Sequence, residues 1–436
     1  MFNLPKYGEG ICLSRLAALL DALSVDRHWL QRQSVVVTGS NGKGSTAAFA
    51  AAIGHAAGLR TGLFTSPHLY RFNERFRIDG VEIDDDGLAE LVLRVVTAIA
   101  DLARGGLTEV FGAFEAQFAL ACLYFQESQC DFMVFEAGIG GRYDPVRLVG
   151  ATVSCVTSVD YEHVQLLGNT LELIASDKSD ACAAGGIIVY GENCRPLKRY
   201  LAEYNRSRAV TGVFVRDDIA IENEAMNAAG QSFDVQIAGR RFDGLAMRVL
   251  GDFQFNNAAI AAAMVLQWSR RMKADLAIEP AIRAGLRDTV WPGRLEVVQQ
   301  EPLIVIDVGH TPDGVAQALQ SLRAIHGERG WLLVLGVSGD KSIDDIAKHL
   351  ASSFEAIVCT RAHHKGTDAR IVGAAARKAN ANAKIHIANA IEDAVRVSRQ
   401  LARDNRQKIY VAGGLFVAIE YATVLRGGDA KELPFF

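Results

Sequence analysis

The chain has 436 residues, of which 50% are hydrophobic and 22% are charged. This balance is typical of a globular protein of two or three domains and excludes a disordered chain. Lysine and arginine total 46 against 50 for aspartate and glutamate, a net charge of -4. We therefore expect neither a nucleic-acid-coating protein nor one that binds anionic membranes.

The sequence shows no membrane span or targeting segment. The longest apolar stretches, such as 257–268, are shorter than the roughly 18 to 20 residues that cross a bilayer. The first ten residues are polar and have no signal-peptide pattern. Seven cysteines are scattered without a C-x-x-C pair, which is typical of reduced thiols. We expect a soluble, cytoplasmic protein.

In the first part of the chain, short β-branched runs alternate with amphipathic stretches, as in parallel sheets flanked by helices. Strands are predicted at 34–38, 60–64, 132–136, 152–157 and 186–190, with an Ala-rich helix at 44–57. Residues 213–250 differ, because alternating residues and turn signals there indicate a hairpin or a small β appendage.

After Trp291–Arg294 the same rhythm restarts. Strands are predicted at 303–307, 331–335, 356–359, 384–387 and 408–412, and helices at 313–325, 343–352, 368–379 and 391–404. The pattern predicts an α/β protein: a P-loop-type parallel sheet in an N-terminal domain (1–296), the β appendage, and a Rossmann-like α/β C-terminal domain (300–436). The boundary is expected near 296–300.

A glycine-rich loop, TGSNGKGST at 38–46, lies between a predicted strand and a predicted helix. This context surrounds a phosphate with backbone N–H groups and a helix N-terminus. Lys43 would reach the β and γ oxygens, and Ser45 or Thr46 would offer a hydroxyl to Mg²⁺. The spacing departs from G-x-x-x-x-G-K-[ST], since Val37 replaces the first glycine and Gly44 follows the lysine. A simple turn is the alternative, but the strand–loop–helix context favours nucleotide binding.

Other polar residues also follow predicted strands. Glu136 ends one strand, His163 follows another, and Ser66–His68 follows a third; Lys178 lies fifteen residues after His163. Each has an ordinary structural explanation on its own. Ligands of open α/β sheets, however, gather beyond the carboxyl ends of the strands. The shared placement therefore favours one site, in which Glu136 suits a metal.

Together these segments resemble the folylpolyglutamate synthase/dihydrofolate synthase family, within the Mur-ligase-like group of ATP-dependent amide ligases. The matching stretches are GSNGKGST (39–46), TSPHLYRFNERFRIDG (65–80), FEAGIGGRYD (135–144), HVQLLGNT (163–170), WPGRLE (291–296), DVGHTP (307–312), VLGVSGDK (334–341) and VAGGLF (411–416). Their order holds across nearly the whole chain. The resemblance implies an ATP-binding central domain followed by a glutamate-ligase-type domain.

The resemblance also implies roles for individual residues. The ATP phosphates and the rest of the nucleotide would be held by Gly39, Asn41, Gly42, Lys43, Gly44, Ser45, Thr46, Asn257 (on the adenine side), Arg294 and Asp307. One Mg²⁺ would involve Ser45, and a second would lie near Ser66, Glu136 and His163. Pro67, His68 and Asp144 would face the acid substrate.

Three further residues are implied in catalysis. Lys178 matches a lysine that becomes a carbamate, which requires a deprotonated amine, and burial would favour that form. Arg75 and His310 are candidates for holding the incoming amino acid. The implied reaction converts a carboxylic acid to an acyl phosphate and then to an amide with an amino acid, with glutamate expected. The partners are small molecules, and a monomer is expected.

Some positions depart from the family pattern on the acid-substrate side. The family's G-G-R-x-D-A-T-N becomes GGRYDPVR, so Pro145 removes a backbone donor and Arg147 places a cation where an amide is usual. The D-H pair before the metal becomes Glu162–His163. These departures leave open three hypotheses: a folate enzyme, a ligase of the same chemistry acting on a non-folate acid, and a nucleotide-binding protein without turnover.

Overall fold

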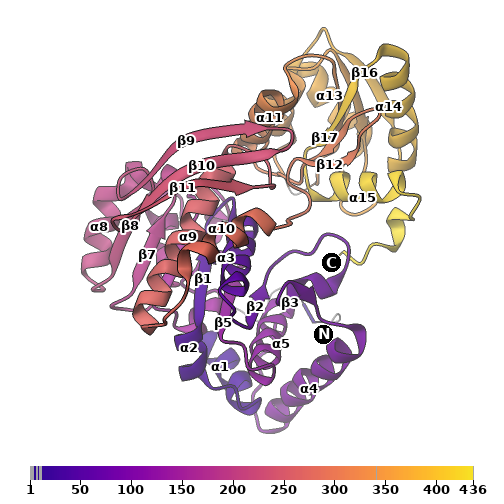
Figure 1. Cartoon of the computed structure of the whole chain (residues 1–436). Helices are drawn as coiled ribbons and strands as arrows, with labels where there is room; N and C mark the ends of the chain where they lie inside the picture. Colours follow the sequence, from indigo (N-terminus) through magenta and orange to yellow (C-terminus); the bar gives the residue numbers. More distant parts are fainter. Residues whose placement is uncertain (1–3, 6–7, 9–11, 340, 436) are drawn as a thin grey trace.

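The computed structural model describes residues 4–5, 8, 12–339 and 341–435. Within these ranges the chain forms an eight-stranded sheet, a three-stranded sheet and a six-stranded sheet, with helices packed around them (Figure 1). The first and last sheets each belong to an α/β unit, so the predicted α/β class is confirmed.

The eight-stranded sheet has the order β4-β3-β2-β5-β1-β6-β7-β8 and is parallel from β2 to β8. Its strands are β1 (Ser34–Thr38), β2 (Thr61–Phe64), β3 (Phe76–Ile78), β4 (Val81–Glu82), β5 (Phe132–Glu136), β6 (Val153–Val156), β7 (Ile187–Tyr190) and β8 (Thr211–Phe214). The strands predicted in this region are confirmed. β3 and β4 add an antiparallel edge.

Helices cover both faces of this sheet. They are α1 (Leu13–Ala22), α2 (Arg27–Gln33), α3 (Lys43–Ala56), α4 (Asp85–Arg104), α5 (Ala113–Glu127), α6 (Val164–Leu167), α7 (Leu171–Ser179), α8 (Lys198–Arg206), α9 (Phe253–Met272) and α10 (Ile278–Asp288). On one face Val35 packs with Phe49 of α3 and Ile282 of α10; on the other, Val36 packs with Phe118 of α5. A strand buried on both faces has no polar alternation, which is why β1 reads SVVVT.

The predicted β appendage is a three-stranded antiparallel sheet of β9 (Ile219–Asn227), β10 (Gly230–Ile237) and β11 (Arg240–Met247). Its inward side chains pack on α9, where the rings of Phe233 and Phe255 lie 5.5 Å apart. The first residues of the predicted region, 213–214, belong instead to β8 of the large sheet.

The six-stranded sheet has the order β12-β13-β17-β14-β15-β16. Its strands are β12 (Glu296–Gln299), β13 (Ile304–Ile306), β14 (Trp331–Leu335), β15 (Ala356–Thr360), β16 (Lys384–Ala388) and β17 (Lys408–Ala412), and its helices are α11 (Pro312–His326), α12 (Ile343–Ala351), α13 (Ala369–Ala379), α14 (Ile391–Asn405) and α15 (Leu415–Leu425). The predicted strands and helices are confirmed; β12 and α15 are additions. The boundary at 296–300 stays a prediction, and the chain joins this sheet at Glu296.

The two α/β units meet through specific polar contacts. Thr311, which caps α11, donates its hydroxyl to Asn41 Oδ1 at 3.1 Å. Arg426, just after α15, donates across to the Tyr70 hydroxyl at 3.0 Å and, within its own unit, to Glu296 Oε1 at 2.9 Å. The connection between the units turns at Leu295, whose φ of +44° is in the left-handed region. The edge of the first sheet at which β1 and its parallel neighbours end therefore faces the second unit.

No helix in the described part of the chain is both long and apolar enough to cross a bilayer. The seven cysteines, which all lie within the described ranges, are free thiols.

Candidate active site

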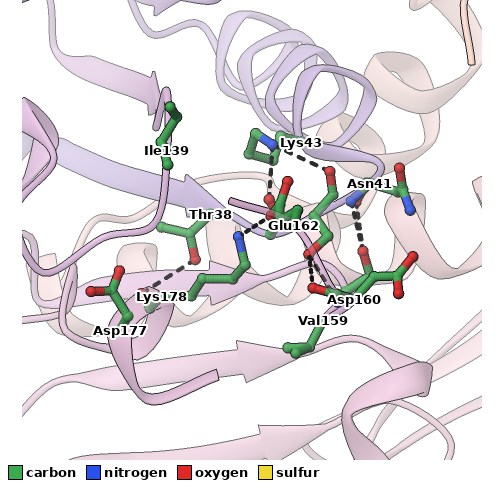
Figure 2. Close-up of polar contacts among 12 residues, drawn as sticks. Thr38, Asn41, Lys43, Ile139, Val159, Asp160, Glu162, Asp177 and Lys178 are labelled. Atoms are coloured by element: carbon green, nitrogen blue, oxygen red, sulfur yellow. Dashed lines mark hydrogen bonds and ion pairs between the residues drawn. The ribbon is translucent and has the colours of Figure 1, made fainter. Parts of the chain in front are cut away.

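The loop between β1 and α3 has the geometry of a phosphate-binding loop. Gly39 and Gly42 adopt φ values of +143° and +85°, which suit glycine. A Cβ on Gly42 would lie 2.5 Å from Asn257 Oδ1, so the loop has no room for a side chain there. Lys43 begins α3 and folds back, with Nζ donating to the carbonyls of Gly39 at 2.8 Å and Ser40 at 3.4 Å (Figure 2).

Two buried polar atoms of this loop have no hydrogen-bond partner among the described residues. They are Asn41 Nδ2 and the Thr46 hydroxyl. An unsatisfied buried group of this kind costs about 1–3 kcal/mol, and phosphate oxygens could accept from both. The Ser45 hydroxyl, in contrast, accepts from Gln254 Nε2 at 3.3 Å. The donors of the loop thus fit a nucleotide triphosphate, while the Mg²⁺ role of Ser45 stays a prediction.

The remaining nucleotide candidates lie near the same loop. Asn257 lies against Gly42 and donates to Gln254 Oε1 at 2.9 Å; its adenine role stays a prediction. A Cβ on Gly44 would lie 2.9 Å from Trp291, so the connection to the second unit packs directly on the first turn of α3.

Glu136, at the end of β5, is a buried carboxylate surrounded by cations. Its Oε2 accepts from the backbone N–H of Ser66 at 2.9 Å. Burial raises the pKa of Glu136 to about 7, against the opposing charges of Lys43, Arg294 and Arg75. These cations come from α3, from the connection and from the segment after β2. The structure thus brings four of the predicted residues together with Ser66.

Lys178 and Glu162 form a buried ion pair beside the loop. The Lys178 side chain is 1% exposed, and its Nζ donates to Glu162 Oε1 at 2.5 Å (Figure 2). Burial lowers the pKa of Lys178, and the Glu162 carboxylate opposes that shift. Burial alone would raise the pKa of Glu162, but the ammonium groups of Lys178 and Lys43 lower it to about 2. The pairing of Lys178 with Glu162 was not predictable from the sequence, because the two residues lie on different elements.

A second metal site is not preformed. Within the part of the chain that the structure describes, no three His, Cys, Asp or Glu side chains lie together in a way that could hold a metal. His163 is exposed, and desolvation lowers the pKa of its imidazole. The metal roles of Ser66, Glu136 and His163, and the carbamate on Lys178, stay predictions.

Arg75 is a buried cation held by neutral groups. Its Nε donates to His68 Nδ1 at 2.9 Å, and its Nη1 donates to Gln117 Oε1 at 3.1 Å. Burial lowers the pKa of Arg75 to about 10, so it stays charged at neutral pH. Burial and the Arg75 charge lower the pKa of His68 to about 4, so His68 is neutral. Pro67, between Ser66 and His68, is exposed.

Asp144 and Arg147 are occupied within their own domain. The Asp144 carboxylate accepts from the N–H groups of Gly138 and Ile139, both at 2.9 Å, and of Val146 at 3.1 Å. Burial raises its pKa to about 6. Arg147 donates to the main-chain carbonyls of Asp180 and, at 3.1 Å, Cys182.

Arg147 therefore binds carbonyls just beyond α7. Its guanidinium joins η2 (Pro145–Val149) to the end of that helix, and its effect on the acid substrate stays a prediction.

The second unit contributes Asp307 and His310. Asp307, just after β13, accepts from Gly309 N at 2.7 Å and from Leu295 N at 3.1 Å. Burial raises the pKa of Asp307, and the Arg294 charge opposes the shift. His310 is exposed to solvent; crowding by the surrounding protein atoms, together with the charges of Lys341 and Arg294, lowers its pKa to about 4. Lys341, which ends the VLGVSGDK stretch, was not among the predicted site residues.

Comparison with known proteins agrees with this geometry. Residues 293–414 match the model of the Mur ligase, glutamate ligase domain. The chain is 31% identical over 356 residues to the dihydrofolate synthase/folylpolyglutamate synthase of Bacillus subtilis, covering 81% of each chain. It is 32% identical over 343 residues to the folylpolyglutamate synthase of Lacticaseibacillus casei, covering 79% of each. The chain belongs to the folylpolyglutamate synthase/dihydrofolate synthase family.

Solved structures of this family have the same fold. A Mycobacterium tuberculosis folylpolyglutamate synthase complexed with ADP and AMPPCP aligns with a TM-score of 0.86 at 27% identity, covering 96% of both chains. A folylpolyglutamate synthase complex with AMPPCP and folate aligns with a TM-score of 0.85 at 29% identity, covering 97% of both. Members of this family are ATP-dependent ligases, and so is this chain.

The unpartnered Thr46 hydroxyl generates a prediction. Thr46→Val should leave the melting temperature of the nucleotide-free protein unchanged or raise it, because a buried group without a partner is removed. It should weaken ATP binding roughly 10-fold, since a hydrogen bond to a charged oxygen is lost. Thermal unfolding and calorimetric titration with ATP measure the two effects.

The control for this variant is Thr289→Val. Thr289 is buried, and its hydroxyl donates to the Gly285 carbonyl at 2.6 Å; its loss should lower the melting temperature and leave ATP affinity intact. A Thr46→Val protein that melts lower but binds ATP normally would contradict the assignment of Thr46 to the nucleotide site.

Proposed function

We propose that this ligase joins glutamate to dihydropteroate, to a reduced folate, or to both, through an acyl phosphate. The observation that carries the proposal is the convergence of Lys43, Arg75 and Arg294 on the buried Glu136 carboxylate beside the phosphate loop. The names of the relatives, and a related structure that holds both AMPPCP and folate, support the choice of acid.

In the first step a carboxylate oxygen of the acid attacks the γ-phosphorus of ATP. A new P–O bond forms, the bond between the β and γ phosphates breaks, and ADP leaves. Two anions must approach each other, so the Lys43 ammonium lowers their repulsion and orients the phosphate oxygens. Ser45, and separately Ser66, Glu136 and His163, would hold Mg²⁺, which when bound would supply further neutralisation of phosphate charge.

In the second step the amino group of glutamate attacks the acyl carbon, phosphate leaves and the nitrogen loses a proton. The charged Arg75 would anchor a carboxylate of the incoming amino acid. His310 is neutral at pH 7, given its pKa of about 4, so it would hold the amino acid through a hydrogen bond rather than through charge. Contact between the two units would keep water from the acyl phosphate.

The acid substrate is the open part of this proposal. Arg147, the main departure that favoured a non-folate acid, binds main-chain carbonyls instead. We therefore favour the folate hypothesis over a ligase for another acid. We also propose that the enzyme acts on these small molecules as a monomer in the cytoplasm, consistent with its seven free cysteines.

The direct test is phosphate release by the purified protein with Mg-ATP and glutamate. We expect release to be stimulated by dihydropteroate, by tetrahydrofolate, or by both, relative to a reaction without acid. Omitting glutamate should remove most of the stimulated release, because the acyl phosphate then has no amine to react with. No stimulation by either pterin, in a protein that binds ATP, would contradict the folate proposal.

Carbamylation of Lys178 is part of the same proposal. Its burial lowers its pKa toward the neutral amine that reacts with CO₂. Lys178→Ala should reduce activity by at least about 100-fold, because a positioned charged ligand is lost. Formate or acetate should restore part of it by supplying a carboxylate in the vacated space.

The control for Lys178 is Lys198→Ala. Lys198 also pairs with a carboxylate, Asp217, at 2.8 Å, but its side chain is 43% exposed and it lies far along the chain from the loop. This variant should keep full activity and show no response to formate. Full activity in Lys178→Ala would refute the carbamate, and loss without rescue by any short carboxylate would leave Lys178 as an ion-pairing residue.

A further inference from the structure

A short segment of the second unit crosses to the first unit and contacts His68, in the segment that follows β2. It follows η4 (Ala430–Glu432) and consists of Leu433–Phe435, here called the crossing segment (Figure 1). The Pro434 carbonyl lies 3.0 Å from His68 Nε2. The Phe435 ring is parallel to the His68 imidazole, with centroids 6.5 Å apart and planes 6° apart.

The crossing segment is anchored on the second unit. Phe435 packs against Phe416 of α15, with ring centroids 4.9 Å apart, and against His364, 5.3 Å away. Leu433 and Phe435 pack on the apolar core of the second sheet, and Leu69 of the first unit packs on the same core. The position of the segment therefore follows that of the second unit.

The hydrogen bonds of His68 have only one consistent arrangement. A guanidinium can only donate, so His68 Nδ1 must accept from Arg75 Nε. A neutral imidazole carries one N–H, which must then be on Nε2 and donate to the Pro434 carbonyl. The chain of bonds runs from the second unit, through His68, to Arg75.

We propose that the crossing segment is a positioning element for Arg75, acting through His68, so that the guanidinium is aligned for the amino-acid substrate only when the second unit is docked. The inference rests on the proposed role of Arg75 in holding that substrate. Arg75 also donates to Gln117, in α5, so the imidazole and this amide both help to set the plane of the guanidinium. Loss of the Pro434 contact frees the imidazole to rotate, and the guanidinium loses a restraint.

A double-mutant cycle in the full chain tests this pathway. Phe435→Ala should raise KM for glutamate about 5- to 20-fold while KM for ATP changes less than 2-fold, corresponding to a loss of about 1–2 kcal/mol in amino-acid binding. His68→Asn keeps an acceptor for Arg75 Nε but has no N–H that reaches Pro434. In the His68→Asn background, Phe435→Ala should have no further effect. Additive effects on KM for glutamate would overturn the proposal.

A second measurement does not depend on the proposed function. In protein labelled with ¹⁵N-histidine, His68, assigned by its absence in His68→Asn, should show an unprotonated Nδ1 and a protonated Nε2. Phe435→Ala should shift these resonances or introduce exchange between tautomers. Unchanged His68 resonances in Phe435→Ala would overturn the proposal. A wild-type protein without glutamate-dependent activity would instead refute the proposed function and leave this test intact.

Tyr70→Phe is the matched control. It removes the 3.0 Å bond between Arg426 and the Tyr70 hydroxyl, another contact between the units, without touching His68. KM for glutamate should stay within 2-fold of wild type. An increase as large as that of Phe435→Ala would overturn the proposal, because any loosening of the units would then explain both variants.

Discussion

The arrangement of the active site depends on the desolvated carboxylate of Glu136. A carboxylate buried at the end of a central strand is costly in its charged form unless cations face it. Lys43, Arg75 and Arg294 supply that charge from three different elements. Each cation is held in place by a different part of the structure. Lys43 is held by the phosphate loop, Arg75 by its contact with His68, and Arg294 by the connection to the second unit. A change in any of them alters the charge balance at Glu136.

The same constraint explains why the site lies where the two units meet. Arg294 belongs to the connection that turns at Leu295, and its charge faces Glu136, Asp307 and His310 at once. Asp307 accepts the Leu295 N–H at 3.1 Å and thereby fixes the connection to the second sheet. Binding a nucleotide would therefore engage both units, because the loop residue Asn41 is already bonded to Thr311.

The sequence predicts much of the fold because its strands are buried on both faces and have uninterrupted apolar runs. α15 was missed for the same physical reason: a helix buried around residues 417–422 has no polar face to give a helical period. β12 was missed because its residues, Glu296–Gln299, are only partly buried at a sheet edge.

Site residues were predictable where a local motif carries them, as for Lys43 in its glycine-rich loop. Partners that depend on tertiary contacts were not predictable. The Glu162 carboxylate beside Lys178, the carbonyls that bind Arg147 and the crossing segment on His68 all come from other elements. No spacing within the chain encodes such contacts, so substitutions in a motif do not by themselves show a change of substrate.

The most direct test of the account follows the oxygen atoms of the acid substrate. The pterin acid that stimulates turnover is labelled with ¹⁸O in both carboxylate oxygens and incubated with the enzyme, ATP and glutamate, and the released phosphate is analysed by mass spectrometry. Attack of the carboxylate on the γ-phosphorus predicts one ¹⁸O atom in each phosphate and one in the amide product. Unlabelled phosphate, or ¹⁸O in AMP, would contradict an acyl phosphate and with it the role assigned to Lys43 and its surrounding charges.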